Sequence, residues 1–432
     1  MPDTIIVGAG IAGLQLGALL AADGHQVLAL EKLPHLGGRA FLWEKDGFTV
    51  DFGVHLIRFG PKSATAAVFR RLGRDLEFVD LGKSKVGFPD GAVTDFPTSP
   101  VGFLTTKLMS PRERLRALAL IVKMRSQKPE DLLEVSVADW MDRLGVTGGL
   151  RRYLTLVSAS MQVCPFLDRS SAGEMILNMQ TVLRRGKSVM YPRRGWKYLY
   201  EVLTETIRRR GEIRTGAAVA RVLVEGGKAI GVELASGERL EAERVVVSLP
   251  AQQLAEVLDP ALMPADFAAY CRELTPTAGL VLDYGLKRRV SEDRGLWYLW
   301  EPMSFGVFTS NLCPEQAPPG KQLLTFFQPA EISDMADSAR AGAMEAALER
   351  ALFRLFPGLE SALEWRRALH LRMVDGVEVN VRQHRGRRPG YRVPGIDRLF
   401  LVGDSLRAGG AGGDVGHESV LECYREMTGK RI

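Results

Sequence analysis

The feature that most constrains the fold is a glycine-rich turn near the start of the chain. The β-branched run 4–7 is followed by Gly8, Gly10 and Gly13, and the apolar segment 14–22 has the composition of a helix. A strand, a Gly-rich turn and a helix in this order are typical of a dinucleotide-binding βαβ unit. Gly8 permits the tight turn, Gly10 lets the backbone approach a pyrophosphate, and Gly13 lets the helix pack on the strand. We therefore expect an α/β fold that binds a diphosphate at a helix N-terminus, through Gly8, Ala9, Gly10, Ile11, Ala12 and Gly13.

A carboxylate closes the second predicted strand. Residues 26–30 form that strand and Glu31 ends it, with seventeen residues between Gly13 and Glu31. A carboxylate at this distance binds the ribose hydroxyls of adenosine and disfavours a 2′-phosphate, so NADP is not expected. Lys32 is included in the predicted site. The alternative is a βαβ unit of the same kind that has lost its ligand.

Composition excludes several classes of protein. Of the 432 residues, 46% are hydrophobic and 25% charged, but the apolar runs are broken by Gly, Pro or charge. None approaches the roughly 18 apolar residues of a transmembrane helix. The N-terminus lacks the basic and then apolar layout of a secretory signal, so we expect a cytoplasmic protein.

The cysteines and the basic residues indicate neither metal nor nucleic acid as a partner. The four cysteines match no disulfide framework and no metal-ligand spacing, so we expect buried free thiols and no metal. The formal charge of +6 is modest, and nothing resembles a nucleic-acid-binding module. We expect the arginine clusters at 208–210 and 385–388 to lie on solvated faces or at helix C-termini.

Two motifs after Glu31 resemble a known family. Leu36-Gly37-Gly38-Arg39-Ala40 and Asp51-Phe52-Gly53-Val54-His55 resemble the second dinucleotide motif and the Asp-x-Gly segment of the flavin amine oxidase, protoporphyrinogen oxidase and phytoene desaturase superfamily. The resemblance implies that the cofactor is FAD. It also implies that the first motif lies at the pyrophosphate and the flavin, and that the second runs along the flavin. The residues it adds to the site are Gly37, Gly38, Arg39, Ala40, Val54 and His55.

The C-terminal region carries a third motif of the same superfamily. A buried strand ending at Gly403-Asp404 is followed by a Gly-rich turn and a final helix. By the resemblance, Asp404 binds the ribityl chain and the turn faces the pyrimidine end of the flavin, where backbone donors and a positive helix end stabilise negative charge. Gly403, Gly413, Asp414 and Val415 join the predicted site, as does Val219, whose backbone would hold the adenine. Asp414, His417 and Glu418 replace the small or apolar residues usual in the family.

The resemblance implies a two-domain organisation. We expect a Rossmann-like FAD-binding domain of three-layer ββα architecture, with an inserted α+β substrate domain built on an antiparallel sheet. The expected FAD-binding segments are 1–77, 188–255 and 395–432, and the expected substrate segments are 78–187, which reads as helical, and 256–394, which reads as a sheet. Within 78–187, apolar residues at three- and four-residue spacing predict helices at 135–144, 149–163 and 170–184. Aromatic residues on the sheet could line a substrate cavity or form ordinary core: Trp297, Tyr298, Trp300, Phe305, Phe308, Phe326 and Phe327.

The expected function is FAD-dependent hydride transfer. The motifs look most like the phytoene desaturase and carotenoid isomerase branch, which implies an apolar, isoprenoid-like small-molecule substrate and an electron acceptor such as oxygen, a quinone or another carrier. The alternatives are an amine oxidase, a porphyrinogen oxidase, or a flavin-holding scaffold without turnover. Hydride chemistry belongs to the cofactor, so a catalytic residue is not required. The candidates for one are His55, Arg58 and His417.

The segment 111–127 predicts a helix that contacts membrane surfaces. Arg112, Arg116 and Lys123 form a basic stripe, next to an apolar face that includes Leu115 and Val122. A basic amphipathic helix can lie among lipid headgroups, which makes the expected location cytoplasmic and peripheral on the inner membrane face. A second apolar arc is separated from the first by two arginines, so core packing of both arcs is the alternative.

Overall fold

The two ends of the chain meet in one parallel sheet. The structure is a computed structural model that describes residues 1–186 and 189–432. Within that part of the chain the sheet has the order β10-β2-β1-β14-β20: Glu212–Arg214, Val27–Leu30, Thr4–Val7, Arg244–Val247 and Leu399–Leu401. β14 pairs in parallel with both β1 and β20. Because parallel strands end at the same edge, the turn at Gly8 and the turn at Gly403 leave the same edge of the sheet, with the end of β14 between them.

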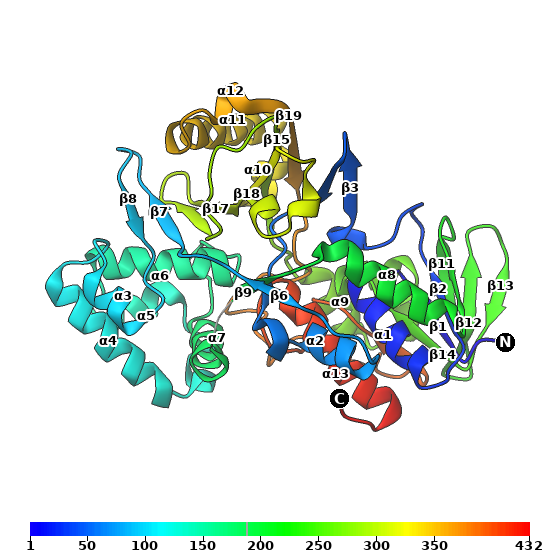
Figure 1. Ribbon diagram of the computed structural model, residues 1–432. Helices are drawn as coiled ribbons and strands as arrows, with labels where there is room; N and C mark the ends of the chain where they lie inside the picture. Colours follow the sequence, from blue (N-terminus) through cyan, green and yellow to red (C-terminus); the bar gives the residue numbers. More distant parts are fainter. Residues whose placement is uncertain (187–188) are drawn as a thin grey trace.

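The parallel sheet lies between a helical layer and a second, antiparallel sheet (Figure 1). The helices α1 (Ile11–Ala22), α8 (Gly195–Arg208) and α13 (Gly413–Thr428) pack together on one face, and the order β11-β12-β13 makes the other layer: Val219–Glu225, Lys228–Leu234 and Arg239–Glu241. The predicted three-layer ββα architecture is confirmed. Arg208 to Arg210 lie at the exposed end of α8, as predicted.

A second lobe is built on a larger sheet. In the described residues it has the order β19-β15-β18-β17-β16-β7-β8: Leu363–Leu371, Ala278–Leu286, Gln322–Ala330, Ser304–Val307, Trp297–Leu299, Lys85–Gly87 and Val93–Asp95. All pairs are antiparallel except β16 with β7. One face is covered by α10 (Ile332–Ala336), α11 (Ser338–Leu355) and α12 (Leu359–Ala362). The aromatic side chains alternate: Trp297 and Phe326 pack on Phe356 under the helices, whereas Tyr298 and Phe305 face the opposite side.

The third lobe consists of helices that start at side-chain caps. α4 (Pro111–Ser126), α5 (Val137–Arg143) and α7 (Ala172–Arg185) begin after serines whose hydroxyls accept backbone N–H groups, and α3 (Pro100–Thr105) and α6 (Gly148–Met161) complete the lobe. The predicted helices 111–127, 135–144, 149–163 and 170–184 agree with these bounds to within two residues. None of the helices in the described ranges is long and apolar enough to cross a membrane.

The segment 78–187, predicted as helical, also contains strands. β7 joins the larger sheet through its pairing with β16, where Val86 is buried, and β8 pairs with β7 at the edge. β6 (Phe78–Asp80) pairs with β9 (Val189–Pro192). Runs of three residues are too short to show a period of two in the sequence. The expected boundary at 187 and 188 lies outside the described residues. The remaining elements are β3 (Leu42–Lys45), β4 (Phe48–Asp51), β5 (Ile57–Arg58), α2 (Ala64–Arg71) and α9 (Ala265–Glu273).

Candidate active site

A continuous cavity of about 1730 Å³ joins the three lobes. At one end it is lined by Gly8, Gly10, Glu31 and Arg39, and at the other by Tyr153, Met161, Tyr298 and Phe305. Typical sites for one small molecule have volumes of about 300–1,000 Å³. The cavity therefore has room for a dinucleotide and a second large ligand in contact with it.

The N-terminus of α1 is built as an anion site. Its cap residue is Gly10, and no side chain of the described residues caps it, whereas the hydroxyls of Ser63, Ser110 and Ser171 cap α2, α4 and α7. The uncapped N–H groups and the helix dipole favour an anion. A methyl group on Gly10 would meet nothing within 4 Å, but one on Gly13 would lie 2.5 Å from the Gly8 carbonyl oxygen. Gly10 thus leaves space in the cavity and Gly13 permits close packing, so the residues present fit a diphosphate.

Glu31 fixes the Gly-rich turn from the next strand. One carboxylate oxygen accepts the Ala9 N–H at 3.0 Å and the other accepts the Leu33 N–H at 3.0 Å. Glu31, Lys32 and Leu33 all line the cavity. A carboxylate has about four acceptor positions, so two remain for the ribose hydroxyls that the sequence analysis assigned to it.

The structure pairs two residues that the sequence analysis assigned to separate parts of the cofactor. Arg39 donates both terminal nitrogens to the carboxylate of Asp404 at 2.7 Å each, and the Gly376 N–H donates to the same carboxylate at 2.7 Å. Burial disfavours the charged form of Asp404, but the charge and hydrogen bonds of Arg39 outweigh it and lower its pKa. About a third of the Arg39 side chain remains exposed, on a residue that lines the cavity.

Asp375 is a cavity residue that the sequence analysis missed. Burial, together with the nearby charge of Asp404, raises its pKa to about 7, and the Thr277 hydroxyl donates to it at 3.0 Å. It lies in an irregular Val-Asp-Gly segment between β19 and β20. No periodic pattern in the sequence identifies such a segment as part of a site. The fold brings it next to Arg39, which donates a hydrogen bond to the carbonyl of Val374.

The three catalytic candidates, His55, Arg58 and His417, all line the cavity. His55 and Trp196 are 5.3 Å apart between ring centroids, and Trp196 and His417 are 6.1 Å apart. Burial lowers the pKa of His417 to about 4, so its ring is neutral at pH 7. Arg58 forms an ion pair with Asp414 at 3.2 Å, and burial raises the pKa of Asp414 to about 6 despite that partner.

The remaining predicted cofactor residues divide into two groups. Ile11, Ala12, Gly37, Gly38, Ala40, Val54, His55, Gly403, Gly413 and Asp414 line the cavity. Ala9, Gly13, Val219 and Val415 are absent from its lining over the described residues. Ala9 acts through its N–H on Glu31, Gly13 is covered by the Gly8 turn, and Val415 is buried inside α13.

The far part of the cavity is a chain of aromatic rings. Phe96 stacks on both Tyr153 and Tyr298, with centroid distances of 5.0 and 4.6 Å, and Phe305 meets Phe327 at 5.4 Å. All five rings line the cavity. The two alternatives for the aromatic sheet residues are therefore both realised, since one face of the sheet forms core and the other forms the cavity wall.

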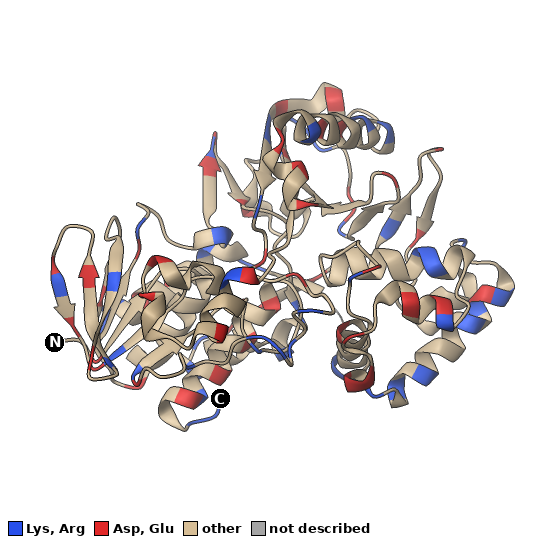
Figure 2. Cartoon of the chain, turned by 180° about the vertical axis from the view of Figure 1, so that it is seen from behind, with Lys and Arg blue, Asp and Glu red and all other residues tan. Residues whose placement is uncertain are grey.

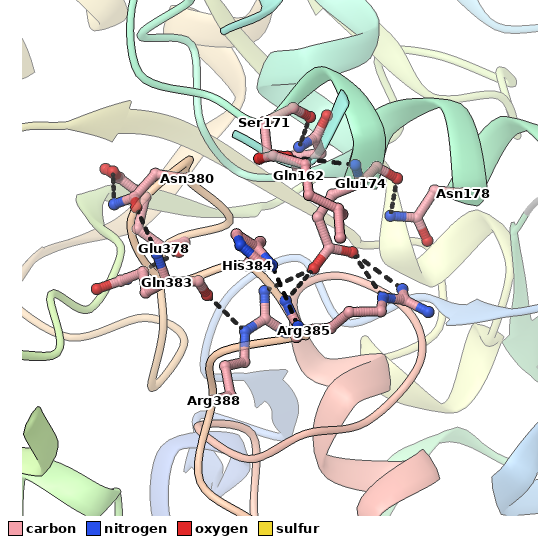
Figure 3. Close-up of polar contacts among 12 residues, drawn as sticks. Gln162, Ser171, Glu174, Asn178, Glu378, Asn380, Gln383, His384, Arg385 and Arg388 are labelled. Carbon is pink, nitrogen blue, oxygen red and sulfur yellow. Dashed lines mark hydrogen bonds and ion pairs between the residues drawn. The ribbon is translucent and has the colours of Figure 1, made fainter. Parts of the chain in front are cut away.

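A buried ion cluster holds α7, which forms part of the cavity wall (Figure 3). Glu174 is fully buried and accepts hydrogen bonds from Arg385, through its N–H at 2.6 Å and its Nε at 3.0 Å, and from Arg388 at 3.3 Å. The expectation that 385–388 lies on a solvated face or at a helix end is wrong for Arg388, which has no exposed surface, whereas Arg387 is exposed. Such a cluster is held in the interior by its paired charges.

The end of the cavity at Gly8, Gly10, Glu31 and Arg39 is a dinucleotide cradle at the edge of the parallel sheet, and the end at Tyr153, Met161, Tyr298 and Phe305 is an apolar chamber. The two together define the class of flavoprotein oxidoreductases. The chain matches the family model of flavin-containing amine oxidoreductases over residues 11–417 and belongs to that family.

The chain is similar to two curated relatives and to one solved structure. It is 26% identical to the zeta-carotene-forming phytoene desaturase of Myxococcus xanthus over 67% of this chain and 61% of that protein. It is 29% identical to the phytoene desaturase of Cercospora nicotianae over 57% of this chain and 44% of that protein. The chain thus spans less than two thirds of the length of each of these relatives. An oxidoreductase from Methanosarcina mazei shares the fold, with a TM-score of 0.80, 22% identity and coverage of 99% and 100% of the two chains.

Proposed function

We propose that the protein is an FAD-dependent desaturase-like enzyme that removes hydrogen from a long apolar substrate of isoprenoid type. The observation that carries this proposal is the continuity of the cavity from the diphosphate cradle to the aromatic chamber. When bound, the flavin supplies a hydride acceptor. The chain's own residues bind the dinucleotide, orient the substrate and exclude water from the contact between them.

We propose FAD rather than FMN because the cradle suits the adenosine half of FAD. The uncapped N-terminus of α1 suits the diphosphate, and Glu31 on the neighbouring strand suits a ribose. FMN has neither the second phosphate nor the adenosine ribose that would use these groups. Protein purified without added cofactor should release FAD on denaturation, and release of FMN alone would contradict the assignment.

The chamber supports an apolar substrate. Aromatic and aliphatic side chains from α6, α7 and the larger sheet make its walls, among them Val157, Met161, Met179 and Phe327. Burial of apolar surface in such a chamber stabilises a hydrocarbon by about 25 cal/mol per Å². A small charged amine would leave most of these walls in contact with water.

Anaerobic bleaching of the flavin absorbance tests the proposal. Phytoene in lipid vesicles should bleach the flavin, whereas putrescine and a porphyrinogen should not. Bleaching by either of the latter would favour the amine or porphyrinogen oxidase alternatives. A flavin that no compound reduces would favour a scaffold without turnover.

Exposed apolar side chains on α3 and α4 support contact with a membrane surface. One apolar arc of α4 is buried at Leu120 and Met124. In the other arc Leu118 packs against the core, but Leu115 is 65% and Val122 is 66% exposed. The exposed Val101 on α3 also lines the cavity. Residues 100–128 contain seven Lys or Arg and one Glu, and blue segments mark the helical lobe in Figure 2. Apolar side chains among cations suit anionic headgroups.

Flotation with vesicles tests this contact. The protein should float with vesicles rich in phosphatidylglycerol at low salt, and the double variant Leu115→Glu, Val122→Glu should not. Arg208→Glu, at the exposed end of α8, is the matched control. Equal flotation of the double variant and the control would remove the proposed surface.

A further inference from the structure

His55 is held in one tautomer by its surroundings. Its Nε2 lies 3.1 Å from the carbonyl oxygen of Phe52. A carbonyl can only accept, so Nε2 carries the proton and Nδ1 of the neutral ring carries a lone pair. The indole N–H of Trp196 donates to the carbonyl of His55 at 3.1 Å, and its ring packs edge-on against the imidazole. Backbone and ring are both fixed.

The electrostatic surroundings keep this imidazole neutral. Burial lowers the pKa of His55; the Phe52 carbonyl opposes that effect, and the charge of Arg39 adds to it. The other titratable groups nearby are His417, whose pKa is also lowered, and Asp404, which is paired with Arg39. His55 is therefore in its basic form at pH 7.

Within the described residues, three other polar groups of the cavity already have partners, unlike Nδ1 of His55. Arg39 is paired with Asp404, Arg58 with Asp414, and the Nδ1 of His417 with Gln15 at 2.7 Å. Nδ1 of His55 makes no hydrogen bond to the described part of the chain. The residue is half-buried and lines the cavity where the cradle meets the chamber. A hydride donor and its acceptor must touch there.

We propose that Nδ1 of His55 is the base that accepts the proton which the substrate loses during desaturation. The inference rests on the proposed function and names a catalytic residue for it. Forming the double bond breaks two C–H bonds. One hydrogen leaves with its electron pair to the cofactor; the other leaves as a proton to Nδ1, and its bonding pair becomes the new π bond. Departure of the hydride leaves a carbocation beside the second C–H, so a neutral imidazole is a strong enough base. The imidazolium then returns its proton to water.

The kinetic test compares His55→Gln with the wild type and with His370→Gln, an exposed histidine as the matched control. Glutamine keeps an N–H for the Phe52 carbonyl but has no base. With phytoene in vesicles, the rate constant of anaerobic flavin bleaching should fall by about 10²-fold or more in His55→Gln, while half-saturation stays unchanged. Because the pKa of His55 is lowered, the wild-type rate should fall only at a pH below the ordinary histidine pKa of about 6.5, and His55→Gln should lack this acid limb. Equal rates in His55→Gln and His370→Gln would overturn the proposal.

A second measurement is independent of turnover. The ¹⁵N NMR signals of the His55 ring, assigned by their loss in His55→Gln, should show a protonated Nε2 and an unprotonated Nδ1 at pH 7, with and without bound FAD. A protonated Nδ1 would overturn the assignment of the base. A wild-type flavin that phytoene does not bleach would instead contradict the proposed function, and the NMR result would remain interpretable.

Discussion

Gly10→Ala should weaken FAD binding, whereas Gly13→Ala should destabilise the fold, although the two residues lie one helical turn apart. The Cβ of Gly10→Ala would enter open space, and the backbone there has φ −69°, which alanine adopts freely. The free energy of unfolding of the FAD-free protein should change by less than about 1 kcal/mol. The methyl group would instead occupy the place of the diphosphate. We expect FAD affinity to fall by at least about tenfold, or about 1.4 kcal/mol.

At Gly13 the added Cβ has no room in the folded protein. It would lie 2.5 Å from the Gly8 carbonyl oxygen and 2.8 Å from the Ser248 hydroxyl, so α1 must move away from β1 and β14. Overpacking of this kind costs about 1–3 kcal/mol, of which the better helix propensity of alanine offsets up to about 1. Gly13→Ala should therefore destabilise the FAD-free protein.

Two assays separate these effects. Urea unfolding of FAD-free protein reports stability, and titration with FAD, followed by quenching of flavin fluorescence, reports affinity. Wild-type affinity in Gly10→Ala would refute the placement of the diphosphate on this turn. Unchanged stability in Gly13→Ala would refute the packing argument.

Three further predictions concern carboxylates of the cavity. Glu31→Ala should weaken FAD binding by about 1.5–3 kcal/mol in the same titration and leave the flavin spectrum unchanged, since Glu31 faces the ribose; a shifted spectrum would contradict this. Asp404→Ala should lower the free energy of unfolding by about 3 kcal/mol at pH 7, because it leaves Arg39 without its partner, and also perturb the flavin spectrum. Since the pKa of Asp404 is lowered by folding, this loss should disappear as the pH falls below about 4, and a pH-independent loss would count against the ion pair. The pKa of Asp414 is instead raised to about 6, so Asp414→Asn should gain stability relative to the wild type between pH 4 and pH 7, and a constant difference in urea unfolding would exclude this effect.

The sequence by itself determined the dinucleotide turn, whereas the layers around it were implied by the family resemblance. Local constraints suffice for the turn: a β-branched run must become a strand, glycine alone fits the close approach at Gly13, and Glu31 follows at the end of the next strand. The helices at 135–144, 149–163 and 170–184 were also predictable, since apolar periodicity and serine caps act within a few residues of each other.

Only the tertiary structure decided which side chains meet. Arg39 and Asp404 are 365 residues apart in the sequence, and no local pattern shows that they neutralise each other rather than bind separate parts of the cofactor. The charged segment at 385–388 looks solvated in the sequence, yet Arg388 is buried because Glu174 on a distant helix supplies its partner. The base assigned to His55 likewise depends on the Phe52 carbonyl and on the cavity that forms around it. Hydrogen bonds and burial depend on positions in space, and between distant segments these positions are fixed only when the whole chain packs.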